Sequence, residues 1–427
     1  MVAEEAVELQ EDVEADRPCK RARYETTEDC QEGNSPKHDG FEQSTASSPG
    51  GKLRGYDLFR SIGAPRFICA PMVDQSELAF RMLTRRYGVQ LAYTPMFHAR
   101  LFGENAKYRK QQFTTCPEDR PLFVQFCGDD PDILIRAARH VETAGIDAVD
   151  LNCGCPQGIA RKGHYGAFLL SEADLLTGIV RRMDAELSVP VTVKMRLVTA
   201  EHADKRLQET LNLASSLQAA GCSILTLHGR TKEMKGQSTG VCDWSSIRAV
   251  KQRLHIPLFA NGGIETRDDA LRCLHETGAD GVMSSEALLE VPSLFSGTPV
   301  NQDQLTEEYL QMVKLYDAER KCVKSHLFRF LYAGLQRHID LRAQLGAARN
   351  IEEISAAASA LRERRAAERS AGDTSWPDVG WYQRYRNPLG KDKAKDKEKA
   401  GQEKKQPEMT SDLPEQASCC EGKKTDD

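Results

Sequence analysis

Short apolar runs alternate with amphipathic stretches along the middle of this chain. Most of the runs are rich in Val, Ile, Leu and Phe, which is typical of strands buried on both faces. The eight runs span residues 67–73, 91–96, 121–127, 148–152, 191–197, 224–229, 257–262 and 281–285. Between them apolar residues recur at helical spacing, and Gly or Pro marks several boundaries. The clearest helical stretches span residues 131–144, 172–186, 206–220, 244–253 and 267–277.

This order of elements predicts an α/β fold, specifically a (β/α)8 TIM barrel. Eight strand–helix units in roughly 230 residues suit such a barrel in length and order. A doubly wound sheet is the competing architecture, and it usually carries a Gly-rich nucleotide fingerprint after its first strand. No such fingerprint follows residues 67–73. We therefore expect a barrel over residues 56–300.

The pattern changes after Gly297. Residues 305–345 lack strand signals, and residues 351–369 consist largely of the good helix formers Ala, Glu and Arg. The apolar residues at helical spacing are Leu310, Val313, Leu315, Phe328, Leu331 and Leu335. We expect a smaller, all-helical domain over residues 305–370, packed against the barrel. Its many basic residues form either a solvated face balanced by Glu or a surface for a polyanion, and composition alone slightly favours the first.

Both ends of the chain are charged and poor in large apolar residues. Residues 1–52 are acidic and Ser-rich, so we expect a disordered extension. Residues 371–427 combine an aromatic and basic segment with a Lys-rich tail, which we also expect to be disordered at its end. The basic cluster 19–23 could act as a nuclear import signal, although chance occurrence of so short a cluster is favoured.

Charge, cysteine content and the distribution of apolar residues indicate the cellular compartment of the protein. The net charge of −5 is mild, and the chain holds thirteen cysteines. The N-terminus is acidic without an apolar segment, and no apolar run approaches the length of a membrane span. We therefore expect free thiols in a reducing compartment, a cytoplasmic or nuclear location, and no membrane partner.

Polar residues cluster at the predicted carboxyl ends of the strands, where barrel enzymes gather their catalytic groups. A lone Gln or His in a strand is most often a hydrogen-bonded core residue, but six polar ends in register favour a functional site. The six polar ends are Gln125, Asn152, Lys194-Met195-Arg196, His228, Asn261-Gly262-Gly263 and Ser285-Glu286, and the first strand ends in Pro71-Met72-Val73-Asp74.

Two features of these residues indicate a functional site. Lys194 and Arg196 lie two residues apart in a strand, so both point to the same side, where two cations favour an anion. Cys155 follows the strand at 148–152 on a Gly-rich loop, which suits a reactive thiol better than core packing. The strand pleat turns Cys153 to the opposite side, so we expect a structural role for it.

A flavin matches these groups. A lysine stabilises its anionic reduced form, and Gln and Asn amides match the polar edge of its ring. Gly262-Gly263 allow close backbone approach, and the loops after strands seven and eight of a barrel often hold a phosphate. Zinc is the alternative for Cys153, Cys155 and His164, but no second cysteine pair with suitable spacing follows, so we expect no metal.

Five motifs give the chain a family resemblance over roughly residues 56–345. They read APMVDQSELAFR, LNCGCPQGIARKGHYGAFLL, VKMR, LHGR and NGGI. With these motifs the chain resembles the tRNA-dihydrouridine synthases. The stretches YDLFRSIGAPRFICAPMVDQSELAFRMLTRRYG and LAYTPMFHARLF are most similar to the eukaryotic members that act on positions 16 and 17 of the tRNA D-loop.

The resemblance implies an oxidoreductase that acts on a CH–CH bond, the C5–C6 bond of uracil. FMN would be the bound cofactor and NADPH or NADH its reductant, with hydride passing from flavin N5 to uracil C6. Cys155 would be the proton donor to C5. The implied cofactor-binding residues are Pro71, Met72, Val73, Gln125, Lys194, His228, Asn261, Gly262, Gly263, Ser285 and Glu286. Asn152 and Arg196 would face the substrate base.

The resemblance also implies tRNA as the partner, bound in part by the helical domain, with a monomer favoured. One departure concerns Ser284-Ser285-Glu286, where many bacterial members carry an Arg-containing phosphate motif. A nucleophilic Cys155 is the rival role, because Arg161 and Lys162 could lower the pKa of a nearby thiol. A barrel flavoenzyme acting on a free pyrimidine and a noncatalytic RNA-binding protein are the alternative functions.

Overall fold

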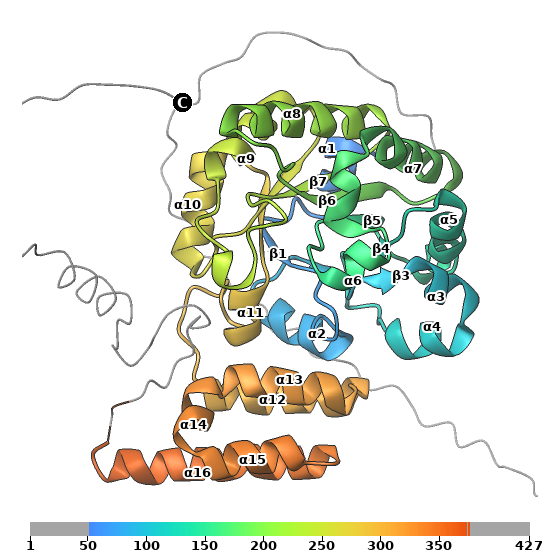
Figure 1. Ribbon diagram of the computed structural model, residues 1–427. Coiled ribbons are helices and arrows are strands. Elements are labelled where there is room, and N and C mark those ends of the chain that lie inside the picture. The colour runs from blue at the N-terminus through green and yellow to red at the C-terminus, as the bar shows by residue number, and fades with distance from the viewer. Residues whose placement is uncertain (1–50, 374, 376–427) are drawn as a thin grey trace, which may run out of the picture. The chain divides into compact units, whose positions relative to one another are not determined.

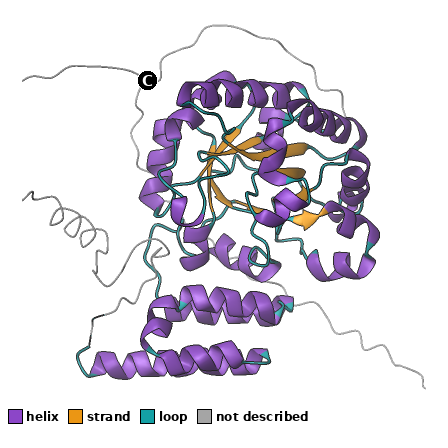
Figure 2. Ribbon diagram, viewed as in Figure 1, coloured by secondary structure: helices purple, strands orange, loops and turns teal. Residues whose placement is uncertain are grey.

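Eight parallel strands close into a barrel in the computed structural model, which describes residues 51–373 and 375. Successive strands pair in chain order, and the β9–β1 and β2–β4 pairings complete the ring. The strands are β1 (Phe67–Cys69), β2 (Leu91–Tyr93), β4 (Leu122–Cys127), β5 (Ala148–Cys153), β6 (Val191–Arg196), β7 (Leu225–His228), β8 (Leu258–Asn261) and β9 (Gly281–Ser284). The predicted TIM barrel is confirmed (Figures 1 and 2).

Two predicted elements differ in detail from the structure. The run at 91–96 ends as a strand at Tyr93, and a further short strand, β3 (Phe97–His98), pairs with β4. The stretch at 131–144 divides into the helix α5 (Pro131–Arg139) and a 3-10 turn, η1 (Glu142–Ala144). Gly145 ends that turn with a φ of 68°, a left-handed conformation that glycine adopts without strain.

Helices surround the strands, as Figure 2 shows. Some of them begin at residues whose side chains satisfy free backbone N–H groups: Asp130 caps α5, and Thr266 forms a capping box with Asp269 at α10. The elements are α1 (Gly55–Ser61), α2 (Leu78–Arg86), α3 (Ala99–Glu104), α4 (Ala106–Gln112), α6 (Gly158–Lys162), η2 (Gly166–Ser171), α7 (Ala173–Glu186), α8 (Ala203–Ala219), η3 (Gly236–Ser238), α9 (Trp244–Arg253), α10 (Arg267–Thr277) and α11 (Glu286–Glu290).

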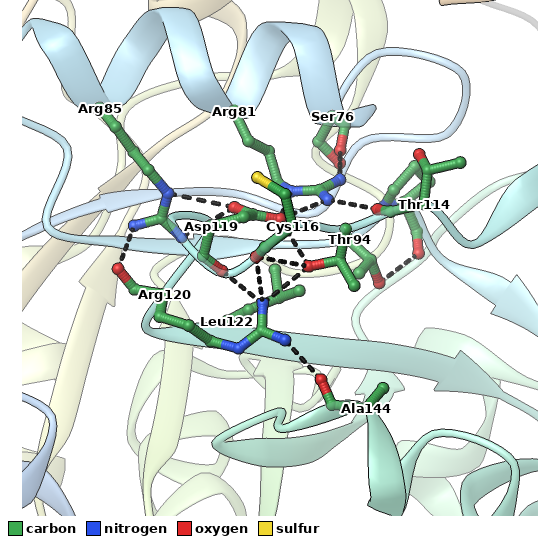
Figure 3. Close-up of polar contacts among 12 residues, drawn as sticks. Ser76, Arg81, Arg85, Thr94, Thr114, Cys116, Asp119, Arg120, Leu122 and Ala144 are labelled. Carbon is green, nitrogen blue, oxygen red and sulfur yellow. Dashed lines mark hydrogen bonds and ion pairs between the residues drawn. The ribbon is translucent and has the colours of Figure 1, made fainter. Parts of the chain in front are cut away.

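A buried carboxylate fastens α2 to the segment before β4 (Figure 3). Asp119 is fully buried and accepts hydrogen bonds from Arg81 Nε (3.0 Å) and Nη2 (2.6 Å) and from Arg85 Nε (3.1 Å). Arg85 also donates to the carbonyl of Pro121, immediately before β4 (2.7 Å). Burying charges is costly unless they are paired and hydrogen-bonded, as they are here. This network therefore joins α2 to the segment that leads into the amino end of β4.

The segment after the barrel is helical, as expected. It consists of α12 (Gln302–Tyr316), α13 (Arg320–Phe330), α14 (Tyr332–Arg337), α15 (Ile339–Ala347) and α16 (Ile351–Ser370). Helix α12 packs on α2, and α13 packs on α11. Of the apolar residues expected in this segment, Leu315 is exposed, whereas Val313, Leu331 and Leu335 are buried.

Several expectations concern parts of the chain outside the described residues. These are the disorder of both ends, the basic cluster at 19–23, and the aromatic and Lys-rich segments beyond Ser375. Within the described part, the nine cysteines are all free. The same part contains no helix long and apolar enough to cross a membrane and no group of three His, Cys, Asp or Glu side chains placed to hold a metal ion.

Candidate active site

A cavity of about 490 Å³ opens at the carboxyl ends of the barrel strands. The loops that line it follow β1, β5, β7, β8 and β9, and β6 contributes Lys194 and Arg196 from the strand itself. The predicted site residues among its walls are Pro71, Lys194, Arg196, His228, Asn261, Gly262, Gly263, Ser285 and Glu286. The structure therefore brings nine of the predicted residues together in one cavity.

Lys194 contributes a cation to the cavity wall. Its Nζ donates to Asn261 Oδ1 over 2.9 Å, and Asn261 Nδ2 donates to the carbonyl of Met283 over 2.9 Å. Burial lowers the pKa of Lys194 to about 8, with a further lowering from the charge of Arg196, while Asp150 acts in the opposite direction. A negative ligand in the cavity would favour the protonated lysine.

Arg196 joins two loops at the mouth. Its Nε donates to the carbonyl of Gly154, and its Nη1 donates to the carbonyl of Thr231, both over 2.9 Å. Burial lowers its pKa to about 10, and the charge of Arg230 contributes to the lowering. Because the guanidinium holds backbone groups on both sides, its predicted contact with the substrate base stays a prediction.

His228 is held neutral in the same wall. Burial lowers its pKa well below the ordinary value, and the charges of Arg196, Lys194 and Arg230 act in the same direction. Its Nε2 lies 3.2 Å from Nη1 of Arg230. Since a guanidinium can only donate, Nε2 is the acceptor and Nδ1 carries the proton.

Gly262 shows why the loop after β8 needs glycine. Its φ is +100°, and a Cβ placed there would lie 2.6 Å from Cδ2 of His228. Gly263 follows with a φ of +76°. Two residues without side chains thus line the cavity together with Lys194 and Arg230, and the carbonyl of Gly262 accepts from Nε1 of Trp244 over 3.0 Å. This combination of cations and bare backbone fits an anionic ligand such as a flavin phosphate.

Cys155 lies beside the cavity, in a loop with a defined backbone. It is half-buried and packs with a small apolar cluster that includes Cys127 and Tyr165. Its N–H donates to Asn152 Oδ1 (3.0 Å), and its carbonyl accepts from the N–H of Ala167 (3.1 Å). By contrast, Cys153 is fully buried in the barrel core, which raises its pKa well above the ordinary value.

Five predicted residues do not line the cavity. Met72 is buried, Val73 is 56% exposed, and Cys155 lies beside the opening. Gln125 and Asn152 lie in the barrel interior, with their amides engaged by each other. Direct contacts of these five residues with a cofactor or substrate therefore stay predictions.

Three residues near the mouth received no role from the sequence. Arg230 lines the cavity, and Lys235 lines it and reaches the carbonyl of Pro156 (2.5 Å). Asp150 lies one layer below, bonded to Gln125. Arg230 was detectable because it stands in the LHGR motif, and Asp150 because it precedes Asn152 by two residues on the same strand face. No local pattern marks Lys235.

A barrel that gathers cations, amides and a neutral imidazole around one cavity at the carboxyl ends of its strands has the arrangement typical of TIM-barrel enzymes. Comparison with known protein families shows to which family the chain belongs. The model of the Dihydrouridine synthase family matches residues 68–371, and the chain belongs to that family.

Curated relatives agree with this assignment. The chain is 45% identical over 316 residues to the mouse protein named "tRNA-dihydrouridine(16/17) synthase [NAD(P)(+)]-like", covering 73% of this chain and 65% of that one. It is 42% identical to the Schizosaccharomyces pombe tRNA-dihydrouridine(16/17) synthase, covering 73% and 82% of the two chains. For the Saccharomyces cerevisiae enzyme of the same name the identity is 45%, with 69% and 72% covered. The chain therefore spans a little under two thirds of the mouse relative.

Proposed function

We propose that this protein is a tRNA-dihydrouridine synthase that reduces uridine at positions 16 and 17 of the D-loop, with FMN as cofactor and NADPH or NADH as reductant. The family match and the names of the 42–45% identical relatives support the reaction. The observation that carries it in this chain is the placement of Cys155 beside a cavity lined by Lys194, His228 and Asn261.

The cavity suits FMN in charge and shape. Lys194, Arg230 and the backbone at Gly262 and Gly263 would hold its anionic groups, and Asn261 would face its polar edge. The chemistry that FMN would supply there, once reduced by NADPH or NADH, is a hydride for C6 of the uracil ring. The walls at Ser285 and Glu286 are the remaining candidates for the ribityl phosphate end, as backbone and hydroxyl donors.

The residues of the chain then act on the base. Hydride addition at C6 leaves negative charge at C5 and the C4 carbonyl, so a proton is needed at C5. The Cys155 thiol, half-buried on the braced loop, would supply that proton. Arg196 keeps the loop of Cys155 joined to the loop after β7. The neutral His228 would serve as a hydrogen-bonding group and not as a cation.

We assign the first contact with tRNA phosphates to the start of α13. Arg320 and Lys321 are exposed there, and Lys321 contacts Asp74, which follows the cavity segment at Pro71. Other arginines of the helical segment are paired with acids, as in Arg362–Glu307 (3.3 Å), Arg364–Asp340 (2.8 Å) and Arg365–Asp303 (2.8 Å). The exposed pairs of Arg362 and Arg364 support a balanced solvated face for α16, whereas Arg365 is buried. The assignment to α13 rests on the exposure of Arg320 and Lys321 beside the segment that follows Pro71, where a phosphate would compete with Asp74 for Lys321.

Dihydrouridine formation tests the proposal. FMN-loaded protein, NADPH and unmodified tRNA with uridine at both positions would be incubated, and the nucleosides measured by mass spectrometry. Cys155→Ala should lower the rate by about 100-fold or more. Cys116→Ala, which removes another half-buried thiol away from the mouth, should change it less than about twofold.

The outcomes separate reaction from mechanism. Product from wild type with undiminished product from Cys155→Ala would remove Cys155 as proton donor while keeping the reaction. No product from FMN-loaded wild type on any such tRNA would reject the tRNA reductase.

A further inference from the structure

A chain of hydrogen bonds between buried side chains leads to the backbone of Cys155. Thr192 Oγ1 donates to Asp150 Oδ1 (2.6 Å), and Gln125 Nε2 donates to Asp150 Oδ2 (2.8 Å). Asn152 Nδ2 donates to Gln125 Oε1 (2.8 Å). Asn152 Oδ1 then accepts the N–H of Cys155 (3.0 Å). Gln125 is predicted to contact the flavin and Asn152 the substrate base. In the structure these two residues also connect Asp150 to the loop of Cys155.

The barrel register produces this arrangement. Asp150 on β5 lies opposite Gln125 on β4 and Thr192 on β6. All three are at most 1% exposed. Asn152 follows Asp150 by two residues and so points to the same interior face. The linked groups therefore form a buried polar cluster across β4, β5 and β6.

The chemical asymmetry of Asp150 gives the chain of bonds a direction. A carboxylate can only accept, so Gln125 must turn its NH2 group toward Asp150 and its carbonyl toward Asn152. Asn152 must then donate to Gln125, which leaves its own carbonyl for the N–H of Cys155. Reversing either amide would place two donors or two acceptors face to face. The N–H groups of Gly154 (3.1 Å) and Cys155 (3.0 Å) both donate to Asn152 Oδ1, so the buried charge at one end and the loop backbone at the other require the same orientation of the two amides.

Such a carboxylate is costly to bury. Burial raises the pKa of Asp150 to about 6, although the hydrogen bonds from Gln125 and Thr192 and the charge of Lys194 act in the opposite direction. An apolar residue of similar size would fill the same space without this cost. The hydrogen bonds that Asp150 accepts from Gln125 and Thr192 explain a carboxylate at this position better than packing does.

We propose that Asp150 is a positioning residue: through Gln125 and Asn152, its carboxylate holds the loop of Cys155 in its working conformation. This proposal rests on the proposed role of Cys155 as proton donor. The positioning itself is measurable without the reaction, because the exposure of the Cys155 thiol depends on the same loop.

The test uses full-length, flavin-free protein and the alkylation rate of Cys155 by iodoacetamide, measured by peptide mass spectrometry. In Asp150→Asn the neutral carbonyl accepts a weaker hydrogen bond from Gln125 than the carboxylate does, so the chain of bonds that leads to the loop of Cys155 is weakened. Alkylation of Cys155 should become roughly fivefold faster. The half-buried Cys116 in the same sample should react at an unchanged rate, since it lies outside this chain of bonds.

Two further variants separate orientation from general loosening. Exchanging acid and amide in Asp150→Asn/Gln125→Glu places an acceptor at position 125 for Asn152, so alkylation should return to within about twofold of wild type. Thr192→Val removes a bond to the other carboxylate oxygen without entering the path to Cys155, so it should leave alkylation unchanged. If Asp150→Asn does not fold, the exchange variant and Thr192→Val decide the question.

Wild-type alkylation of Cys155 in folded Asp150→Asn would overturn the proposal. So would an equal acceleration in Thr192→Val, or an exchange variant that leaves Cys155 unprotected. In the FMN-loaded enzyme, Asp150→Asn should lower kcat with little change in KM for tRNA. If wild type makes no dihydrouridine while the alkylation pattern holds, the proposed function fails and the positioning stands.

Discussion

Nζ of Lys194 on β6 donates to Oδ1 of Asn261 on β8 over 2.9 Å, across the intervening strand β7. Asn261 Nδ2 in turn donates to the carbonyl of Met283 on β9. The hydrogen-bond partner of Lys194 is therefore a neutral amide, and among the described carboxylates the charge of Asp150 acts on it. A lysine in that position favours an anionic ligand, since a nearby negative charge would offset the cost of burying the ammonium group.

Removing the charge of Lys194 should weaken flavin binding. Lys194→Met keeps most of the side-chain volume and loses a charge-assisted hydrogen bond, which contributes about 1.5–3 kcal/mol. We expect the affinity for FMN to fall about 10-fold to 100-fold, measured by fluorescence quenching on titration into flavin-free protein. Lys205→Met, an exposed lysine on α8, is the matched control and should bind as wild type does. Equal affinities in both variants would contradict the role of Lys194.

The affinity for FMN should also depend on pH. Because burial lowers the pKa of Lys194 to about 8, the lysine loses its proton as the pH rises through 8, and flavin affinity should decline there. Lys194→Met should show a flatter profile between about pH 7 and 9. Unfolding does not explain such a decline: a lysine pKa below its ordinary value makes the folded state relatively more stable as pH rises from 8 toward 10.5.

The junction of barrel and helical segment depends on Glu77. Its carboxylate lies 3.0 Å from Nε2 of the fully buried His326 and accepts the hydroxyl of Tyr309 over 2.7 Å. Phe80 stacks on His326 with ring centroids 4.4 Å apart. Glu77→Ala would leave two buried donors without this acceptor, and we expect a loss of about 3 kcal/mol in the free energy of unfolding by urea at pH 7.

The pH dependence of that loss follows from the pKa of Glu77. Burial raises this pKa, but the charge and hydrogen bond of His326 and the hydroxyl of Tyr309 together hold it below the ordinary value. The stabilisation is therefore complete above about pH 4.3 and disappears as the pH falls through the lowered pKa. Asp57→Asn, which breaks the exposed pair with Arg60, should change stability by less than about 0.5 kcal/mol. A comparable loss of unfolding free energy in both variants would contradict the role of Glu77 at the junction of barrel and helical segment.

Much of the fold and part of the site could be predicted because burial leaves a local pattern in the sequence. The barrel strands read as apolar runs since parallel strands are covered on both faces. Lys194, His228 and Asn261 were detectable because polar residues rarely end such runs without a function. The two-residue strand Phe97–His98 had no such pattern, since its assignment depends on pairing with β4.

The remaining features depend on the spatial neighbours of a residue. Asp150 stands inside an apolar run, and its partners Gln125 and Thr192 come from other strands, so only the register reveals their layer. Arg196 was expected to face a substrate, yet its donors reach carbonyls in two loops. No sequence pattern encodes which carbonyl a loop will present.

Gly166 should be indispensable to the conformation of the Cys155 loop. Its φ is +71°, and an added Cβ would lie 2.7 Å from the carbonyl oxygen and 3.0 Å from the Cβ of Cys155. Gly166→Ala must therefore shift that loop, and we expect at least a tenfold loss of dihydrouridine formation together with faster alkylation of Cys155. Gly158→Ala is the matched control on the same segment, because its Cβ would meet nothing within 4 Å. Wild-type activity in Gly166→Ala, or equal losses in both variants, would show that the reaction tolerates displacement of the Cys155 backbone.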